Sequence, residues 1–212
     1  MLLEMKTKEF VDAVASKSPA PGGGSVSALA GSLGASLTAM VGNLTIGRKR
    51  YREMEENQQK SLDANFDKAV KSMEVLNELV QKDTTAFNGV MEAMKMPKET
   101  EEEKTERKRA IEEATKGALE IPLEVAKECL EVLKLQKGFG EYGNPNAITD
   151  VGVGALLAYS GLEGALLNVL VNLQGISDPV YVDSINQQCE EIREEGNLIK
   201  ENTLKIVYSK LK

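Results

Sequence analysis

The chain has 212 residues, long enough for one domain with a substantial core, and its 26 Lys and Arg against 33 Asp and Glu give a net charge of −7. Because the chain is net acidic, we expect neither nucleic acid nor an anionic membrane to be its main partner. It contains no histidine, which excludes Ser-His-Asp and Cys-His catalysis and histidine-based zinc sites.

Two features of the composition bear on the cellular compartment. Cys129 and Cys189 have no metal-ligand spacing, so we expect two small buried residues in a reducing environment. The first ten residues include Glu4, Lys6 and Lys8 and lack the apolar segment of a signal peptide. These features predict a cytoplasmic protein.

The sequence predicts helices and no strands, because aromatic residues make up 4% of the chain and no Asn-Gly or Asp-Gly turn occurs. A first helix is expected from about Thr7 to Ser16, and the Pro- and Gly-rich run at 18–24 ends it. Ser25 is the predicted N-cap of a second helix that has no charged residue before Arg48.

Ser25–Gly47 and Val151–Ser177 are both long and apolar enough to raise the possibility of a membrane span. Their polar residues and the mean hydropathy of −0.27 favour two central helices buried in a soluble bundle. Small residues recur along both segments, which allows close backbone approach in a tight helix pair or a dimer interface. They are Gly31, Gly34, Ala35, Thr38, Ala39 and Gly42, and Gly154, Ala158, Gly161 and Ala165.

A third helix carries apolar residues between Leu62 and Met94 at alternating steps of four and three, which predicts a core-facing seam. Asp83 interrupts this seam. A buried carboxylate costs roughly several kcal/mol unless it is paired, hydrogen-bonded or protonated, and such a position raises its pKa toward the range useful for proton transfer. The alternative is a structural Asp that a neighbouring helix or solvent satisfies.

The remaining chain predicts three more helices. A charged, exposed helix starts near Lys98, and Pro122 should kink it. The Gly-rich run at 138–146 should separate it from the second central helix, and Asp178-Pro179 should start the last one. We therefore expect an all-α fold, a single bundle of about six helices over residues 1–212.

Two further groups are candidates for ligand binding. A Gly-rich turn at a helix start exposes backbone N–H groups that favour an anion or oxyanion; its residues are Gly22, Gly23, Gly24 and Ser25. The basic cluster Arg48, Lys49 and Arg50 would either anchor a carboxylate or phosphate or complement the dipole at a helix C-terminus.

Polar residues on the second central helix form another candidate group. Asn168 and Asn172 are one turn apart, so they can share a subsite or form hydrogen bonds between helices. Asp150 points in the same direction as Asn168 but lies about 27 Å away along the helix, so these two cannot share one small subsite.

Motifs along the whole chain, in specific order, resemble one known family. They are Phe10-Val-Asp-Ala-Val, Ser18-Pro-Ala-Pro-Gly-Gly-Gly-Ser25, Asn43-Leu-Thr45, Asp83 with Ala86-Phe87, Met96-Pro97, Ile121-Pro122, Gly143-Asn144, Thr149-Asp150, and Asn168-Val169 with Asn172-Leu173. In these motifs the chain resembles the cyclodeaminase family, the C-terminal domain of formiminotransferase-cyclodeaminase and its stand-alone bacterial relatives.

This resemblance implies an all-helical homodimer that acts on a folate substrate. It implies closure of 5-formiminotetrahydrofolate to 5,10-methenyltetrahydrofolate with loss of ammonia, and stand-alone members are also associated with methenyltetrahydrofolate cyclohydrolase activity. In the closure, N10 attacks the formimino carbon, so a base must take a proton and an acid must protonate the leaving nitrogen. This chemistry needs no metal and no redox cofactor.

For such a reaction we expect Asp83 to transfer the proton and Asp150 to supply a second carboxylate. Arg48 or Lys49 would hold the glutamate tail, and the turn at Gly22–Ser25 would bind substrate. The amides expected to contact the pterin are Asn43, Asn144, Asn168 and Asn172. The competing hypothesis is a non-catalytic helical scaffold whose glycines serve only to form a dimer.

Overall fold

The computed structural model describes residues 1–212 and consists of helices without strands. Five long helices carry the fold, a short helix precedes the first of them and another joins the first to the second, so the expected all-α class is confirmed. The helices are α1 (Thr7–Val14), α2 (Gly23–Thr45), α3 (Lys49–Arg52), α4 (Glu56–Met94), α5 (Glu101–Tyr142), α6 (Ile148–Leu173) and α7 (Pro179–Lys210), with 3-10 turns at Leu2–Glu4 and Pro145–Ala147.

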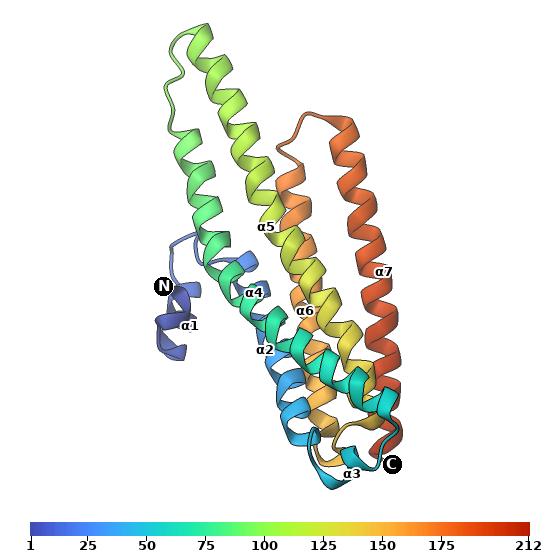
Figure 1. Ribbon diagram of the computed structural model, residues 1–212. Coiled ribbons are helices and arrows are strands. Elements are labelled where there is room, and N and C mark those ends of the chain that lie inside the picture. Colours follow the sequence, from blue (N-terminus) through green and yellow to red (C-terminus); the bar gives the residue numbers. More distant parts are fainter.

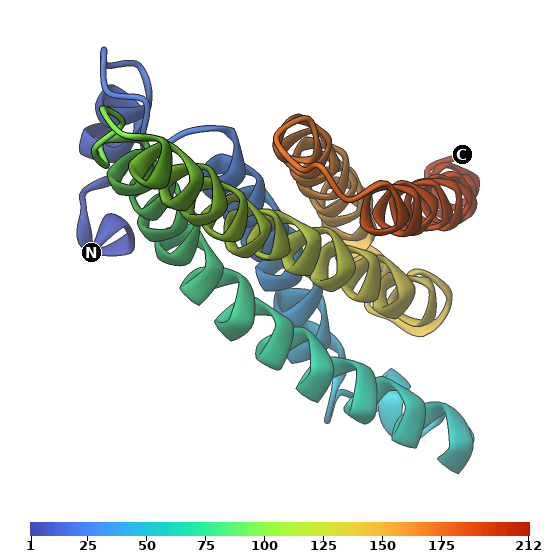
Figure 2. The same ribbon diagram turned by 90° about the horizontal axis from the view of Figure 1, so that it is seen from above.

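Helices α2, α4, α5 and α6 pack around one core, each against two principal neighbours. The hairpin of α4 and α5 extends beyond the other helices at one end, and the short α3 lies at the opposite end (Figure 1). Helix α7 packs on α5 and α6, on the side away from α4 (Figure 2). The first turn of α2 meets α4 at Val80 and Asp83, about two-thirds of the way along α4.

Glycines hold α2 and α6 in close contact. A Cβ on Gly34 would lie 2.9 Å from the backbone nitrogen of Ala158, and a Cβ on Gly161 would lie 2.8 Å from the carbonyl oxygen of Ser27. Side chains at these positions would collide with backbone atoms. The small-residue pattern is therefore used inside the chain as a tight helix pair.

Both central helices are long and apolar enough to cross a membrane by length and composition alone. Within the protein, 61% of the most apolar stretch of α2 is buried. In Pro145–Leu173, which includes α6, 44% of the corresponding stretch is buried. Both helices thus contribute to the core and also leave apolar surface exposed.

The predicted start of α2 is wrong in one detail. The N-cap is Gly22, and Ser25 lies inside the first turn. The Ser25 hydroxyl cannot cap its own helix because it faces α4, where it lies 2.9 Å from the carbonyl oxygen of Val80 and 2.9 Å from a carboxylate oxygen of Asp83.

The expected Gly-rich break at 138–146 is also shorter than predicted. Helix α5 runs as one helix through Pro122 and through Gly138 to Tyr142, so only 143–144 separate it from the next turn. Packing explains the continuation, because Phe139 is 1% exposed and anchors this last part of α5 in the core. The predicted start of α7 is confirmed, since the Asp178 carboxylate accepts hydrogen bonds from two backbone N–H groups of its first turn.

Candidate active site

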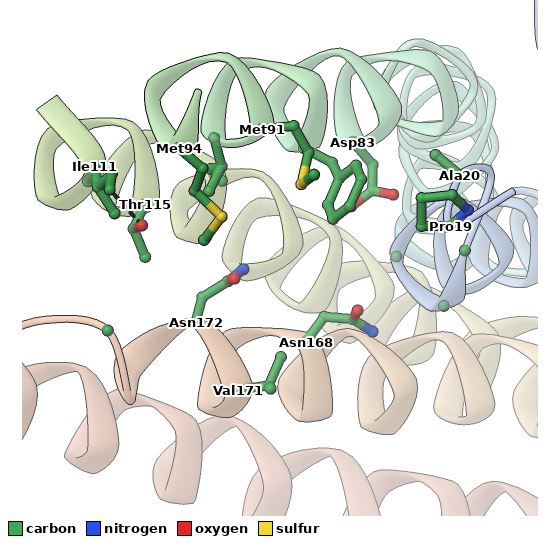
Figure 3. Close-up of a pocket in the computed structure, with 17 residues that line it drawn as sticks. Pro19, Ala20, Asp83, Met91, Met94, Ile111, Thr115, Asn168, Val171 and Asn172 are labelled. Atoms are coloured by element: carbon green, nitrogen blue, oxygen red, sulfur yellow. Dashed lines mark hydrogen bonds between the residues drawn. The ribbon is translucent and has the colours of Figure 1, made fainter. Parts of the chain in front are cut away.

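A cavity of about 440 Å³ opens where the first turn of α2 meets α4, α5 and α6 (Figure 3). This volume lies within the range of small-molecule sites. Its polar groups are Asp83, Thr115, Asn168 and Asn172, together with the glycines before and within the first turn of α2. Its apolar wall includes Phe87, Val90, Met91, Met94, Ile111 and Val171.

Asp83 lies at the inner, polar end of this cavity. The Ser25 hydroxyl donates a hydrogen bond to Asp83 Oδ2 at 2.9 Å, and the hydroxyl oxygens of Ser25 and Thr84 are 3.2 Å apart. The carbonyl oxygen of Val80 is a second acceptor for Ser25, also at 2.9 Å. Ser25 has one hydroxyl proton, so it can donate to an ionised Asp83, or accept from a protonated Asp83 while donating to Val80.

Burial raises the pKa of the Asp83 carboxyl above its usual value, and hydrogen bonds from the side chain and backbone of Ser25 oppose this rise. The carboxyl also lies at the N-terminus of α2, where backbone N–H groups favour negative charge. Burial therefore favours the neutral form of the Asp83 carboxyl, whereas the hydrogen-bond donors of Ser25 stabilise its ionised form. A group balanced in this way is suited to proton transfer.

The glycines of the turn allow α2 to approach both walls of the cavity. A Cβ on Gly24 would overlap the Asp83 carboxylate, and a Cβ on Gly23 would lie 3.1 Å from the Asn168 side-chain nitrogen. Gly22, the N-cap, lines the same cavity. The turn therefore places the start of α2 directly between the predicted acid and the predicted amide.

The two amides come from α6, across the cavity from Asp83 (Figure 3). The Asn168 side chain donates one hydrogen bond, to the carbonyl oxygen of Gly164 at 2.8 Å, and its own carbonyl oxygen has no partner within the chain. Asn172 has no side-chain hydrogen bond and points toward Met94. Both amides therefore retain donors or acceptors for a ligand.

A second group of predicted residues lies at the opposite end of α2. Arg48, Lys49 and Asn144 line a separate cavity of about 220 Å³, and α2 spans about 33 Å between the two cavities. Asn144 fixes this end by donating from its side chain to the carbonyl oxygen of Leu44 at 3.1 Å. Arg48 forms no ion pair, and Lys49 has only an exposed contact of 3.8 Å with Glu53.

Two predicted residues line neither cavity. Asp150 is in the first turn of α6, and the length of this helix separates it from Asn168, as the sequence predicted. Asn43 is exposed near the end of α2, in a shallow depression beside Phe66 and Asp63. Within one chain, the structure therefore does not bring Asp150 or Asn43 to Asp83.

The sequence pattern missed part of the cavity wall. Phe87, Val90 and Met94 belong to the predicted core seam, yet Phe87 and Val90 are only partly buried, Met94 is exposed, and all three line the cavity. The reason is that α2 begins at Gly23, beside Asp83. The part of α4 that follows Asp83 therefore has no residue of α2 packed against it. Thr115 was not singled out because it lies on a highly charged helix, and Met91 because it lies off the seam.

Comparisons with known proteins identify the relatives of this chain. The family model described as formiminotransferase-cyclodeaminase matches residues 6–191. A methenyltetrahydrofolate cyclohydrolase of Methylorubrum extorquens is 39% identical over 95% of both chains. The formimidoyltransferase-cyclodeaminase of Mus musculus is 31% identical over 92% of this chain, which spans only 35% of that longer protein.

A solved structure gives the corresponding comparison in three dimensions. The crystal structure of formiminotetrahydrofolate cyclodeaminase from Thermotoga maritima matches over the full length of both chains, with a TM-score of 0.87 and 26% sequence identity.

Proposed function

The chain belongs to the formiminotransferase-cyclodeaminase family, and from this premise we propose that it is a folate one-carbon enzyme that makes or breaks the one-carbon bridge of 5,10-methenyltetrahydrofolate. The observation that carries the proposal is the Asp83 carboxyl, held by Ser25 at the inner end of a partly apolar cavity. No metal or redox cofactor takes part in the proposed reaction.

Both reactions associated with the family need the same proton transfers. In deamination, N10 attacks the formimino carbon, and ammonia leaves from the tetrahedral carbon. In hydrolysis, water attacks the methenyl carbon, and one folate nitrogen leaves from the tetrahedral carbon. In each, Asp83 takes a proton from the attacking group and returns one to the leaving nitrogen, and Ser25 stabilises the carboxylate between these steps.

Charge and shape also suit this substrate. The methenyl bridge is a cationic amidinium, so an ionised Asp83 beside it stabilises positive charge. The apolar side chains on α4 suit flat aromatic rings, and the free amide groups of Asn168 and Asn172 can bond the polar edge of a pterin.

We give hydrolysis precedence over the deamination expected from the motifs. The supporting observation is the 39% identity to a protein of matching length that is named a cyclohydrolase. Deamination is the second candidate because the Thermotoga maritima protein, which matches over its full length, is named a cyclodeaminase.

The deciding experiment follows methenyltetrahydrofolate by absorbance with purified protein. A hydrolase should accelerate the loss of methenyl absorbance, whereas a deaminase should generate it from 5-formiminotetrahydrofolate with release of ammonia. Neither rate should change after treatment with a chelator. A protein that is inactive with both compounds and shows no folate-induced rise in melting temperature would instead support the scaffold hypothesis.

A further inference from the structure

One threonine beside the candidate active site is oriented differently from other threonines in the helices. A threonine inside a helix commonly donates its hydroxyl proton to the carbonyl oxygen four residues earlier. Five threonines do so, at oxygen–oxygen distances of 2.7–3.1 Å; they are Thr38, Thr45, Thr85, Thr105 and Thr115. Thr84 on α4 forms no such bond, and its hydroxyl oxygen lies 3.2 Å from that of Ser25.

Ser25 occupies the acceptor that Thr84 would otherwise use. The carbonyl oxygen four residues before Thr84 is that of Val80, and the Ser25 hydroxyl lies 2.9 Å from it. The same hydroxyl lies 2.9 Å from Oδ2 of Asp83. Ser25 is fully buried and has a single hydroxyl proton, so two acceptors at equal distance compete for that proton.

The charge on Asp83 decides this competition. A charge-assisted hydrogen bond is about twice as strong as a neutral one, so an ionised Asp83 draws the Ser25 proton away from Val80. The lone pairs of Ser25 are then free to accept, and Thr84 is the hydroxyl donor beside them. Because hydrogen bonds in a chain polarise one another, donation by Thr84 strengthens the bond from Ser25 to Asp83. When Asp83 is neutral, this preference is lost and the Ser25 proton can return to Val80.

We propose that Thr84 is a positioning residue for proton transfer, which acts on Asp83 through Ser25. This role deepens the proposed function and rests on it. The hydrogen bonds from Thr84 to Ser25 and from Ser25 to Oδ2 stabilise the carboxylate relative to the neutral acid, and Oδ1, which has no side-chain partner, remains for the substrate. In the reaction, the bond from the proton to the attacking oxygen or nitrogen breaks and a bond from that proton to Oδ1 forms. The same proton then moves from Oδ1 to the leaving nitrogen.

The other elements around Asp83 contribute no competing charge. Helix α2 has no charged residue, and the residues of α5, α6 and the segment before α2 that line the cavity are uncharged. On α4, the neighbouring Lys82 is exposed and forms an ion pair within its own helix at 3.0 Å. In the turn at Leu2–Glu4, which also packs on α4, the carboxylate pairs with the N-terminal amine. The balance between burial and the hydrogen bonds of Ser25 therefore controls the ionisation of Asp83, and Thr84 acts on that balance.

The ionisation of Asp83 can be measured without any enzyme activity. Carbon-13 NMR of protein labelled at the aspartate carboxyl groups follows its titration, and the Asp83 signal is the one missing from Asp83→Asn. We expect the pKa of Asp83 to rise by about one pH unit in Ser25→Ala, which removes a hydrogen bond to the carboxylate. Thr84→Val removes only the hydroxyl, so the pKa should rise in the same direction by less than half as much. Thr84→Ser keeps the hydroxyl and should retain the wild-type pKa, whereas Thr84→Ala should behave as Thr84→Val does.

A matched control and a double variant separate this role from a general effect on α4. Thr85 is the next residue, and its hydroxyl donates to the carbonyl oxygen of Gln81 in its own helix, so Thr85→Val should leave the pKa of Asp83 unchanged. If Thr84 acts only through Ser25, Ser25→Ala/Thr84→Val should show the pKa of Ser25→Ala alone. Additive changes in the double variant, or an unchanged pKa in Thr84→Val and Thr84→Ala, would overturn the proposal.

Steady-state kinetics tests the consequence for catalysis. A higher pKa of Asp83 lowers its ionised fraction, so at a pH below that pKa the kcat of Thr84→Val should fall by about two- to three-fold, with KM unchanged. Thr84→Ser should restore kcat. A higher KM with an unchanged kcat would assign Thr84 to substrate binding and overturn the proposal. If the wild-type protein has no activity with either folate, the proposed function fails, and the NMR titration still decides whether Thr84 acts on Asp83.

Discussion

Asp83 is the one titratable side chain that lines the larger cavity, so its replacement tests the proposed chemistry directly. Asp83→Asn keeps the volume and can still accept a hydrogen bond from Ser25, but it cannot transfer a proton. We expect kcat to fall by about 10²–10⁴, with the fold and folate binding retained. A kcat within a few-fold of wild-type would assign Asp83 a structural role and leave Asp150 as the candidate acid.

The raised pKa of Asp83 also predicts a pH dependence of stability. Burial raises this pKa in the folded state, so the folded protein holds the proton more tightly than the unfolded chain does. The contribution is fully present below the unfolded pKa and is lost as the pH rises through the folded pKa. The melting temperature of wild-type relative to Asp83→Asn should therefore decrease as the pH rises above ~4, the ordinary pKa of an aspartic acid. A difference that does not change with pH would contradict the raised pKa.

Gly24 offers a second test at the residue scale. A Cβ at this position overlaps the Asp83 carboxylate, which is the movable end of a side chain, so Gly24→Ala should displace the acid without unfolding the protein. A displacement of about 1 Å can lower the rate by about 10²-fold. Gly89→Ala is the control, because Gly89 is in α4 and nothing lies near its Cβ. We expect full activity for Gly89→Ala, and equal activities of the two variants would be inconsistent with the close contact.

At the scale of the elements, the contact between α2 and α6 predicts a pair of opposite effects on stability. In Gly161→Ala the new Cβ would lie within 3.0 Å of backbone atoms of α2, so the helices must separate at a cost of about 1–3 kcal/mol. In Gly117→Ala nothing obstructs the Cβ, and the better helix propensity should add about 0.5–1 kcal/mol. Urea denaturation of both variants measures the difference, and equal shifts would contradict the tight helix pair.

The helices themselves were largely predictable, because each depends on local sequence. The periodicity of α4 and the Asp178-Pro179 start of α7 are signals within a few residues. The errors occurred where tertiary packing decides. Ser25 has the chemistry of an N-cap but bonds α4, and Gly138 suggests a break that the burial of Phe139 overrides.

The candidate site was predictable only in part, for a related reason. A polar residue in an apolar seam identified Asp83, and one-turn spacing identified Asn168 with Asn172, and these three residues do share a cavity. The sequence cannot show that α2 begins beside Asp83, so the apolar wall beyond it was assigned to the core. Nor can it show that Asp83, on α4, lies beside the start of α2, whereas Arg48 follows the end of α2.

At the scale of the whole molecule, this separation makes the basic cluster a test of how substrate is held. An extended chain covers about 3.5 Å per residue, so within one subunit only a long glutamate tail could reach from Asp83 to Arg48. Arg48→Ala/Lys49→Ala should therefore raise KM more for polyglutamylated substrate than for the monoglutamate, and added salt should reduce the difference by screening. Steady-state kinetics with both substrates at two salt concentrations measures this.

Lys60→Ala/Lys68→Ala is the matched control, because it removes the same charge from exposed positions on α4 away from both cavities. Its KM should stay at the wild-type value for both substrates. The chain as a whole is acidic, so long-range attraction of an anionic tail cannot come from net charge and has to come from a local site. If the cluster and control variants raise KM equally, or if the cluster affects mono- and polyglutamate alike, Arg48 and Lys49 serve only to support the structure between α2 and α3.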